Sequence, residues 1–289
     1  MAICIERDIV YGYGGVGCHE AGGPRRVALK LDAYLPAPSA MPAAAIVMAF
    51  GGAFHRGSKE DDTFSDGTGT NTSIAEYCRR FAELGLAAFS VEYRLAQADP
   101  EPGTALLSEP DRVPMSRINP VRAELGLPQA SARMMAGIME AAFDDVASAL
   151  SFVVEQADAF RIDRDRVVLG GFSAGGRCAM YVAYGKRFPV RGVISISGPL
   201  VPVDCAAFLR RPGDVPPLLM ISGEQDLDYV RTYVPEIEQQ FREAGRAVSR
   251  SLVPGATHFF PAEAPTEDGR TVMQVMAASL ATWGCLPSR

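Results

Sequence analysis

The stretch Arg166–Met180, RVVLGGFSAGGRCAM, changes its pattern in the middle, around a single serine. Residues 167–169 (VVL) form a short apolar run typical of a strand that is buried on both faces. Beyond the glycines, apolar residues return at helical spacing, so the stretch predicts a strand, a tight turn and a helix. The turn, Gly171–Gly175 (GFSAG), fits the G-x-S-x-G pattern of a nucleophile elbow, in which flanking glycines leave room for a strained turn. We therefore predict that Ser173 is a catalytic nucleophile; the alternative is a glycine-rich turn with no catalytic role.

The composition provides for a large core and gives no sign of a polyanionic partner. The chain has 289 residues, of which 48% are hydrophobic and 21% charged, and its formal net charge is -6 at pH 7. We expect one α/β domain over residues 1–289, because such folds often reach this size as single domains. Without a basic cluster, we expect no nucleic-acid or membrane partner. The first residues, MAICIERD, carry charges before any signal-like apolar core, which predicts a soluble, cytoplasmic protein.

The cysteines and histidines show no pattern of a disulfide framework or a metal site. The six cysteines are scattered along the chain without a C-x-x-C pair, so we expect free and mostly buried thiols. None of the three histidines has the spacing of a metal site. We therefore expect no metal.

A second glycine motif, YGYGGVG at residues 11–17, formally fits the dinucleotide-binding fingerprint G-x-G-x-x-G. That fingerprint requires a helix to follow, so that the pyrophosphate can lie at the helix N-terminus. Here Gly22, Gly23 and Pro24 follow, and residues 27–35 then alternate as in a strand. We interpret the motif as a loop that joins two antiparallel strands, not as a cofactor site.

Strand and helix patterns alternate over most of the remaining chain. A capping-box sequence at Ser73–Glu76 predicts the start of a helix. Further strands are expected at 44–50, 87–93, 193–196, 218–221 and 247–253, and further helices around 143–153, 230–241 and 272–279. This alternation predicts a mostly parallel sheet with helices on both faces.

Residues 97–140 interrupt the alternation. Prolines recur from Pro100 to Pro128 and rule out one long helix through most of the segment. Methionines gather toward its end, and methionine adapts to varied apolar ligands. An insertion of this length in a compact domain is typical of a lid. We predict a lid or cap here; the alternative is a packed surface excursion.

A serine hydroxyl is a weak nucleophile, so Ser173 requires a base and a group that orients the base. His258 lies in a loop just past the last expected strand, where a parallel sheet places its ligand-facing residues. Asp226 also follows a strand end, and the order Ser173, Asp226, His258 suits nucleophile, acid and base on such a sheet. Glu224 and Asp228 are rival acids. The non-catalytic alternatives are a solvent-facing loop histidine and a helix-capping aspartate.

Together these motifs resemble those of α/β-hydrolase esterases of the carboxylesterase and hormone-sensitive-lipase-like group. The resemblance runs from LDAYLP at residues 31–36 through FGGAF at 50–54 and VEYRLA at 91–96 to GFSAGG and the loops of Asp226 and His258. It implies an α/β-hydrolase fold and a serine hydrolase that cleaves short- to medium-chain or aryl carboxylic esters through an acyl-enzyme, without a cofactor. In that reading Ser173 is the nucleophile, His258 the general base and acid, and Asp226 the carboxylate that orients the histidine.

The resemblance also implies an oxyanion hole. FGGAF occupies the place of the family's HGGGF-type loop, so the backbone N–H groups of Gly52, Ala53 and Ala174 are the expected donors. Two positions depart from the family pattern: Phe50 stands where the motif has histidine, and Ala53 stands where it often has a third glycine. The insertion after VEYRLA is also longer than the crossover common in this group.

Two groups of residues predict the substrate pocket. Phe54, Phe172 and Phe259 each adjoin a catalytic or oxyanion position in the sequence, and Met134, Met135 and Met139 cap the site if the insertion is a lid. No basic residue adjoins the serine closely enough to indicate a carboxylate clamp, although Arg56 and Arg177 remain candidates, so we expect a small, neutral, apolar or aryl ester as the partner molecule. Another acyl bond, as in an arylformamidase, a lactonase or a serine peptidase, and a catalytically silent ligand-binding protein are the alternatives. The oligomeric state stays open.

Overall fold

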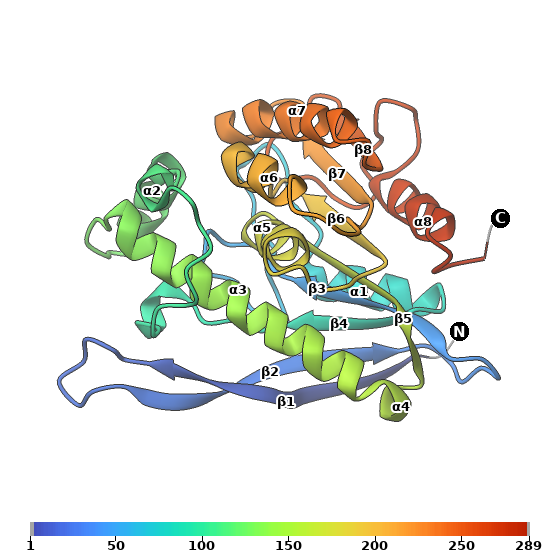
Figure 1. Cartoon of the computed structure of the whole chain (residues 1–289), viewed down its shortest axis with the longest axis horizontal. Helices are drawn as coiled ribbons and strands as arrows, with labels where there is room; N and C mark the ends of the chain where they lie inside the picture. The colour runs from blue at the N-terminus through green and yellow to red at the C-terminus, as the bar shows by residue number, and fades with distance from the viewer. Residues whose placement is uncertain (1–2, 288–289) are drawn as a thin grey trace.

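The computed structural model describes residues 3–287, which form an eight-stranded sheet with helices packed against it (Figure 1). The strands are β1 (Cys4–Val16), β2 (Arg25–Leu35), β3 (Ala43–Ala49), β4 (Ala87–Val91), β5 (Ile162–Phe172), β6 (Gly192–Ile196), β7 (Leu218–Gly223) and β8 (Val248–Val253). Their order in the sheet is β1-β2-β4-β3-β5-β6-β7-β8. Strand β2 runs antiparallel to both neighbours, and the strands from β4 to β8 are parallel. This is the α/β-hydrolase fold, which confirms the fold class predicted from the sequence.

The helices bury both faces of the central strands. They are α1 (Ile74–Glu83), α2 (Met115–Glu124), α3 (Ala132–Glu155), α4 (Ala157–Phe160), α5 (Ala174–Met180), α6 (Pro202–Leu209), α7 (Asp228–Glu243) and α8 (Val272–Thr282). Every residue of β4, β6 and β7 is buried, as expected for parallel strands with helices on both sides. No helix among residues 3–287 is both long and apolar enough to cross a membrane.

Helix α3 corrects the expected start of the helical pattern near residue 143. It begins at Ala132, because Ser131 caps it by accepting a hydrogen bond from the Met134 amide at 3.1 Å and no proline follows Pro128 in this stretch. The methionines near the end of the insertion therefore lie on the first turns of a long helix. In Figure 1 this helix crosses the sheet beside α5.

The first part of the insertion is tied to the body by carboxylates. Glu140 of α3 accepts the amides of Leu106 at 2.7 Å and Leu107 at 2.9 Å. Asp204 of α6 accepts the amide of Ser108 at 3.0 Å. Both carboxylate residues are buried, so these hydrogen bonds fix residues 106–108 against α3 and α6. Helix α2 follows this anchored stretch.

The glycine motif at residues 11–17 lies in a strand and not in the expected loop. The interpretation as a loop is wrong, because strand β1 continues through the motif to Val16, and the turn to β2 comes after it. The glycines serve close approach: a Cβ on Gly14 would lie 2.6 Å from the Arg94 side chain, and one on Gly15 would lie 2.6 Å from that of Glu101. Antiparallel pairing of β1 with β2 and the absence of a following helix agree with the exclusion of a dinucleotide fingerprint.

The capping box expected at the start of α1 is incomplete. At α1, the Ser73 hydroxyl accepts the Glu76 amide at 3.3 Å, but the Glu76 carboxylate binds Arg79 and Arg80. A complete capping box is instead present at α8, between Thr271 and Gln274.

The six cysteines are free thiols, and four are buried: Cys78, Cys178, Cys205 and Cys285.

Candidate active site

Ser173 lies at the turn between β5 and α5, in a backbone conformation that favours glycine. Its φ is 51°, and its amide donates to the Ile196 carbonyl at 2.7 Å. Left-handed backbone at a non-glycine residue costs roughly 1–3 kcal/mol and persists where surrounding packing fixes it. Here the packing is close: a Cβ on Gly175 would lie 2.0 Å from the Ala49 carbonyl oxygen, and one on Gly198 would lie 2.1 Å from that of Ser173. The glycines thus allow a strained turn that presents the serine hydroxyl.

The structure brings the three predicted catalytic side chains into one hydrogen-bonded chain. Nε2 of His258 lies 2.9 Å from Oγ of Ser173, and Nδ1 of His258 lies 2.6 Å from Oδ1 of Asp226. All three residues are buried. When Nδ1 carries the proton and donates to Asp226, Nε2 is free to accept the proton of the serine hydroxyl. The arrangement is that of a nucleophile, a base and an orienting acid.

Asp226 is itself fixed by neighbours that the sequence analysis did not identify. Its Oδ2 accepts the Ser197 hydroxyl at 2.6 Å and the Gly223 amide at 3.2 Å, and Oδ1 also accepts the Leu227 amide at 2.7 Å. Together with Nδ1 of His258, these groups make four donors that hold the carboxylate in place. Ser197 directly follows strand β6, and a polar residue just past a strand end was the signal that could have found it.

The rival acids lie in other contacts. Glu224 is exposed and accepts the Gly255 amide at 2.7 Å. Asp228 is exposed at the start of α7 and pairs with Arg231 at 3.8 Å. Neither carboxylate bonds to His258, so the geometry favours Asp226 as the partner of the histidine.

The loop after β3 turns its carbonyl groups toward protein donors. Gly52 has φ 120°, and Ala53 and Phe54 follow with φ 55° and 63°. The Gly52 carbonyl accepts the amides of His55 and Arg56 at 3.0 and 3.2 Å, and the Phe54 carbonyl accepts the Ala96 amide at 2.8 Å. Within residues 3–287, the amides of Gly52 and Ala53 donate to no protein acceptor.

The three predicted oxyanion donors lie around the serine turn. Ala53 and Ala174 line the same cavity as Ser173, and Gly52 precedes Ala53 in the strained loop. Ala174 is the first residue of α5, where a helix leaves its N–H groups without intrahelical acceptors. This arrangement can supply backbone N–H groups to a negatively charged oxygen next to Ser173.

Asp62 fixes the start of this loop by two hydrogen bonds. It is buried and accepts the Gly51 amide and the Ile74 amide, each at 2.7 Å. Burial raises the pKa of Asp62 to about 6, although the two amides act in the opposite direction. The folded protein therefore holds this proton more tightly than the unfolded chain does.

We predict a pH-dependent stability difference between wild type and Asp62→Asn. Because the folded-state pKa is raised, stability falls as pH rises from about 4 to 6, and the unfolding free energy of wild type relative to the variant should fall by roughly 3 kcal/mol over this window. Urea unfolding at pH 4, 5, 6 and 7 measures it. A difference that stays flat with pH for Asp62→Asn would contradict the raised pKa.

The cavity beside Ser173 is small. Its volume is about 30 Å³, close to what one water molecule occupies in the liquid. Of the six predicted substrate-binding residues, Phe54 and Met139 line it. The other four do not: Met134 is 46% exposed on α3, and Met135, Phe172 and Phe259 are packed in the core.

Basic side chains line this cavity, which corrects the expectation that none adjoins the nucleophile closely. Arg177 of α5 is buried, with its Nε donating to the Pro199 carbonyl at 2.9 Å and its guanidinium 5.3 Å from the centre of the Tyr229 ring. Its Nη2 is buried without a hydrogen-bond partner. Arg117 of α2 lines the same cavity and is partly buried. Burial, reinforced by the charge of Arg56, lowers the pKa of Arg117.

Arg177 is one of the two basic candidates that the sequence offers. Its helical spacing supports it, because it lies four residues after Ser173 at the start of a predicted helix, and residues four apart lie on one face of a helix. Arg117 has no such signal, because it comes from the inserted helix α2.

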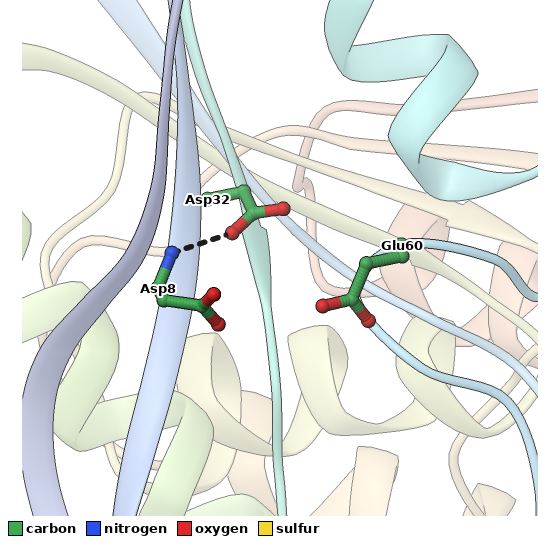
Figure 2. Close-up of side chains that lie close together, drawn as sticks. All are labelled: Asp8, Asp32 and Glu60. Atoms are coloured by element: carbon green, nitrogen blue, oxygen red, sulfur yellow. Dashed lines mark hydrogen bonds between the residues drawn. The ribbon is translucent and has the colours of Figure 1, made fainter.

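A separate group of acids is formed by Asp8, Asp32 and Glu60, which Figure 2 shows facing one another. Their ligand oxygens lie within 4.8 Å of one another. Lys59 already supplies the positive charge: its Nζ lies 2.7 Å from Asp32 and 3.1 Å from Asp8, and it also binds Glu60. Arg7 adds a second contact to Asp32 at 2.7 Å. The cluster thus joins the β1–β2 hairpin to the loop that follows β3.

The fold and this site define a hydrolase of the α/β-hydrolase class. The family model described as the dienelactone hydrolase family matches residues 63–283, and the chain belongs to that family. No curated protein sequence matches the chain.

Solved structures show the same fold. Thermogutta terrifontis esterase 2 phosphoramylated by tabun is 18% identical, with a TM-score of 0.65 over 99% of this chain and 97% of that one. The propionate-bound form of the same esterase is 18% identical, with a TM-score of 0.63 over 98% and 96%. A putative dienelactone hydrolase from Klebsiella pneumoniae is 19% identical, with a TM-score of 0.62 over 97% and 99%.

Proposed function

We propose that the chain is a serine hydrolase that cleaves carboxylic esters through an acyl-enzyme. The observation that carries the proposal is the buried hydrogen-bonded chain from Ser173 through His258 to Asp226, which ends on a strained turn beside a cavity. In the reaction, His258 takes the proton of the Ser173 hydroxyl while the oxygen attacks the ester carbonyl. The amides of Gly52, Ala53 and Ala174 stabilise the resulting oxyanion, and His258 then protonates the leaving alcohol. Water attacks the acyl-enzyme by the same steps.

The substrate is expected to carry a short acyl group. The cavity of about 30 Å³, close to the volume of one water molecule, is smaller than an acetyl group, so even the shortest acyl group requires some movement of the residues that line it. The esterase from Thermogutta terrifontis, which has the same fold, is described with propionate and with butyrate bound. Larger acyl or aryl groups require α2 to move, and in this sense we propose that the insertion at residues 97–140 contains a lid, with α2 as its movable part.

The test of this function is a panel of p-nitrophenyl esters from acetate to hexanoate together with p-nitroacetanilide as the amide counterpart of the acetate. We expect kcat/KM to be highest for the shortest esters and the amide to be cleaved far more slowly. Hydrolysis of the amide at a rate comparable to that of the ester would move the assignment to an amidase or peptidase. No turnover of any ester, with no labelling by a fluorophosphonate, would support the catalytically silent alternative.

A lactone is the second candidate substrate. The family to which the chain belongs takes its name from the hydrolysis of a lactone, which is a cyclic ester opened by the same steps. A lactone of small ring size also suits a small cavity.

The loop Phe50–Phe54 (FGGAF) supports the further proposal that the chain is related in mechanism to esterases of the carboxylesterase and hormone-sensitive-lipase-like group.

We further expect the enzyme to prefer an ester that carries a carboxylate. Arg117 and Arg177 line the cavity, and the buried Nη2 of Arg177 has no protein partner. A substrate carboxylate would satisfy such donors by charge-assisted hydrogen bonds. This replaces the expectation of a neutral substrate.

The charge preference is tested with 4-acetoxybenzoate and its methyl ester, which differ at the remote carboxyl group alone. Arg117→Gln should lower kcat/KM about 10-fold or more for 4-acetoxybenzoate, since a hydrogen bond to a charged group contributes roughly 1.5–3 kcal/mol, and should leave the methyl ester within about twofold. The methyl ester is the internal control. Equal effects on both substrates would show that Arg117 does not read substrate charge.

A further inference from the structure

The loop that supplies two of the oxyanion donors cannot hold its shape by backbone preference. Ala53 and Phe54 are consecutive non-glycine residues in the left-handed region, with φ 55° and 63°. Such backbone persists where neighbouring groups fix it. The Gly52 carbonyl, in the same peptide group as the Ala53 amide, is held by the amides of His55 and Arg56. The next peptide group is held through the Ala53 carbonyl, so a contact to that carbonyl fixes the left-handed turn from its other side.

His55 makes that contact. It is fully buried, and its Nδ1 lies 2.7 Å from the Ala53 carbonyl oxygen, which can only accept, so Nδ1 carries the proton. Its other ring nitrogen, Nε2, is then an acceptor, and it lies 2.9 Å from Nη1 of Arg122. Arg122 thus selects the form of the ring that can bind the Ala53 carbonyl. Burial and the nearby guanidinium of Arg122 lower the pKa of His55, which agrees with a neutral ring.

Arg122 is itself held rigidly. It is 5% exposed, and its Nε donates to the Pro128 carbonyl at 2.6 Å, just past the end of α2. Ile118, one helical turn earlier, lines the cavity beside Ser173, so one face of α2 meets both the cavity and His55. Arg122 does not line that cavity, so it acts at a distance from the reacting atoms.

A second contact joins the same two segments. Arg56 follows His55, and its Nη1 lies 2.9 Å from Glu124 of α2. Glu124 is 57% exposed, however, and an exposed ion pair contributes little. The buried link through His55 is the stronger of the two.

We propose that Arg122 is a positioning residue for the oxyanion hole and acts through His55. The proposal rests on the proposed serine-hydrolase function: the inserted helix α2 fixes the ring of His55, the ring fixes the Ala53 carbonyl, and the loop then presents its amides to the oxyanion. The link serves the transition state, in which the oxyanion forms, more than the bound ester.

The first test is the steady-state kinetics of Arg122→Gln on p-nitrophenyl acetate. Misplacing oxyanion donors costs transition-state stabilisation, so we expect kcat to fall roughly 10- to 100-fold with KM within about twofold of wild type. The matched control is Arg133→Gln, because Arg133 is 76% exposed and pairs with the equally exposed Asp111. The control should keep wild-type kcat. An unchanged kcat in Arg122→Gln, with or without a change in KM, would overturn the proposal.

The second test asks whether Arg122 acts through His55. His55→Asn keeps a donor that can reach the Ala53 carbonyl but ends short of Arg122. The two substitutions are combined in a double-mutant cycle. Arg122→Gln should change kcat less than twofold when it is introduced into the His55→Asn variant. Effects that multiply would show that Arg122 acts by another route. Thermal melting of each variant confirms that the compared proteins are folded.

A spectroscopic readout separates this proposal from the function on which it rests. The chain has three histidines, so the ¹⁵N imidazole signals can be assigned with His55→Asn and His258→Ala. Wild type should show His55 neutral with the proton on Nδ1, and Arg122→Gln should move its Nε2 signal and leave that of His19 unchanged. A proton on Nε2 of His55 in wild type would overturn the proposal even if esterase activity is found. The expected signals with no esterase activity would leave the link in place and refute the proposed function instead.

Discussion

Ser173→Ala is expected to lower kcat for ester hydrolysis by about 10⁴-fold or more while the protein stays folded. The substitution removes one oxygen from a side chain whose hydroxyl bonds to His258, and the other groups of the site remain. Alanine, like serine, has a Cβ, so it adopts the strained φ of 51° without a new clash. Residual activity should come from binding and from the oxyanion donors.

The measurement pairs kinetics with covalent labelling. A fluorophosphonate should modify wild type at Ser173 and leave the variant unlabelled. Ser148→Ala is the control, because Ser148 on α3 bonds to a carbonyl of its own helix. Wild-type turnover by Ser173→Ala, or labelling at a different residue, would refute the serine mechanism.

His258→Ala is expected to be about as severe as Ser173→Ala, because nucleophile and base act as one unit. The double variant should therefore be little worse than either single variant. Asp226→Asn should be milder if its amide oxygen still accepts from the Nδ1 proton. His19→Ala, at an exposed position, is the matched control and should keep full activity.

The pH profile gives an independent check on the base. Wild-type activity should fall on acidification, since a protonated imidazole cannot accept the serine proton. A kcat that stays flat on acidification, or His258→Ala with more than a few per cent of wild-type activity, would exclude His258 as the base.

Local sequence predicted the fold well where a single stretch determines the structure. The change from strand to helix around Ser173 gave β5, the turn and α5, because each period reflects which faces are buried. The positions of Asp226 and His258 after strand ends also placed them on one edge of a parallel sheet. Their hydrogen bonds are consistent with this, since parallel strands end at the same edge.

The features that the sequence did not predict depend on pairs distant in the chain. His55 and Arg122 are far apart in sequence, and neither position has a pattern that indicates the other. The sequence predicts a loop for the glycines of β1, because the side chains for which they leave room, those of Arg94 and Glu101, come from a distant segment. The lid hypothesis predicts Met134 and Met135 over the site, but the early start of α3 places Met135 in the core and Met134 at the surface.

The double duty of helix α2 limits how such an enzyme can acquire new substrates. Ile118 and Arg117 border the cavity, whereas Arg122 on the same short helix holds His55. Exchanging the whole helix for a relative's sequence would alter the range of accepted esters. Unless an arginine stays at position 122, the exchange would also slow the hydrolysis of every ester. Evolution or engineering of selectivity is therefore expected to proceed by single changes at the cavity-facing positions, with Arg122 retained in each step.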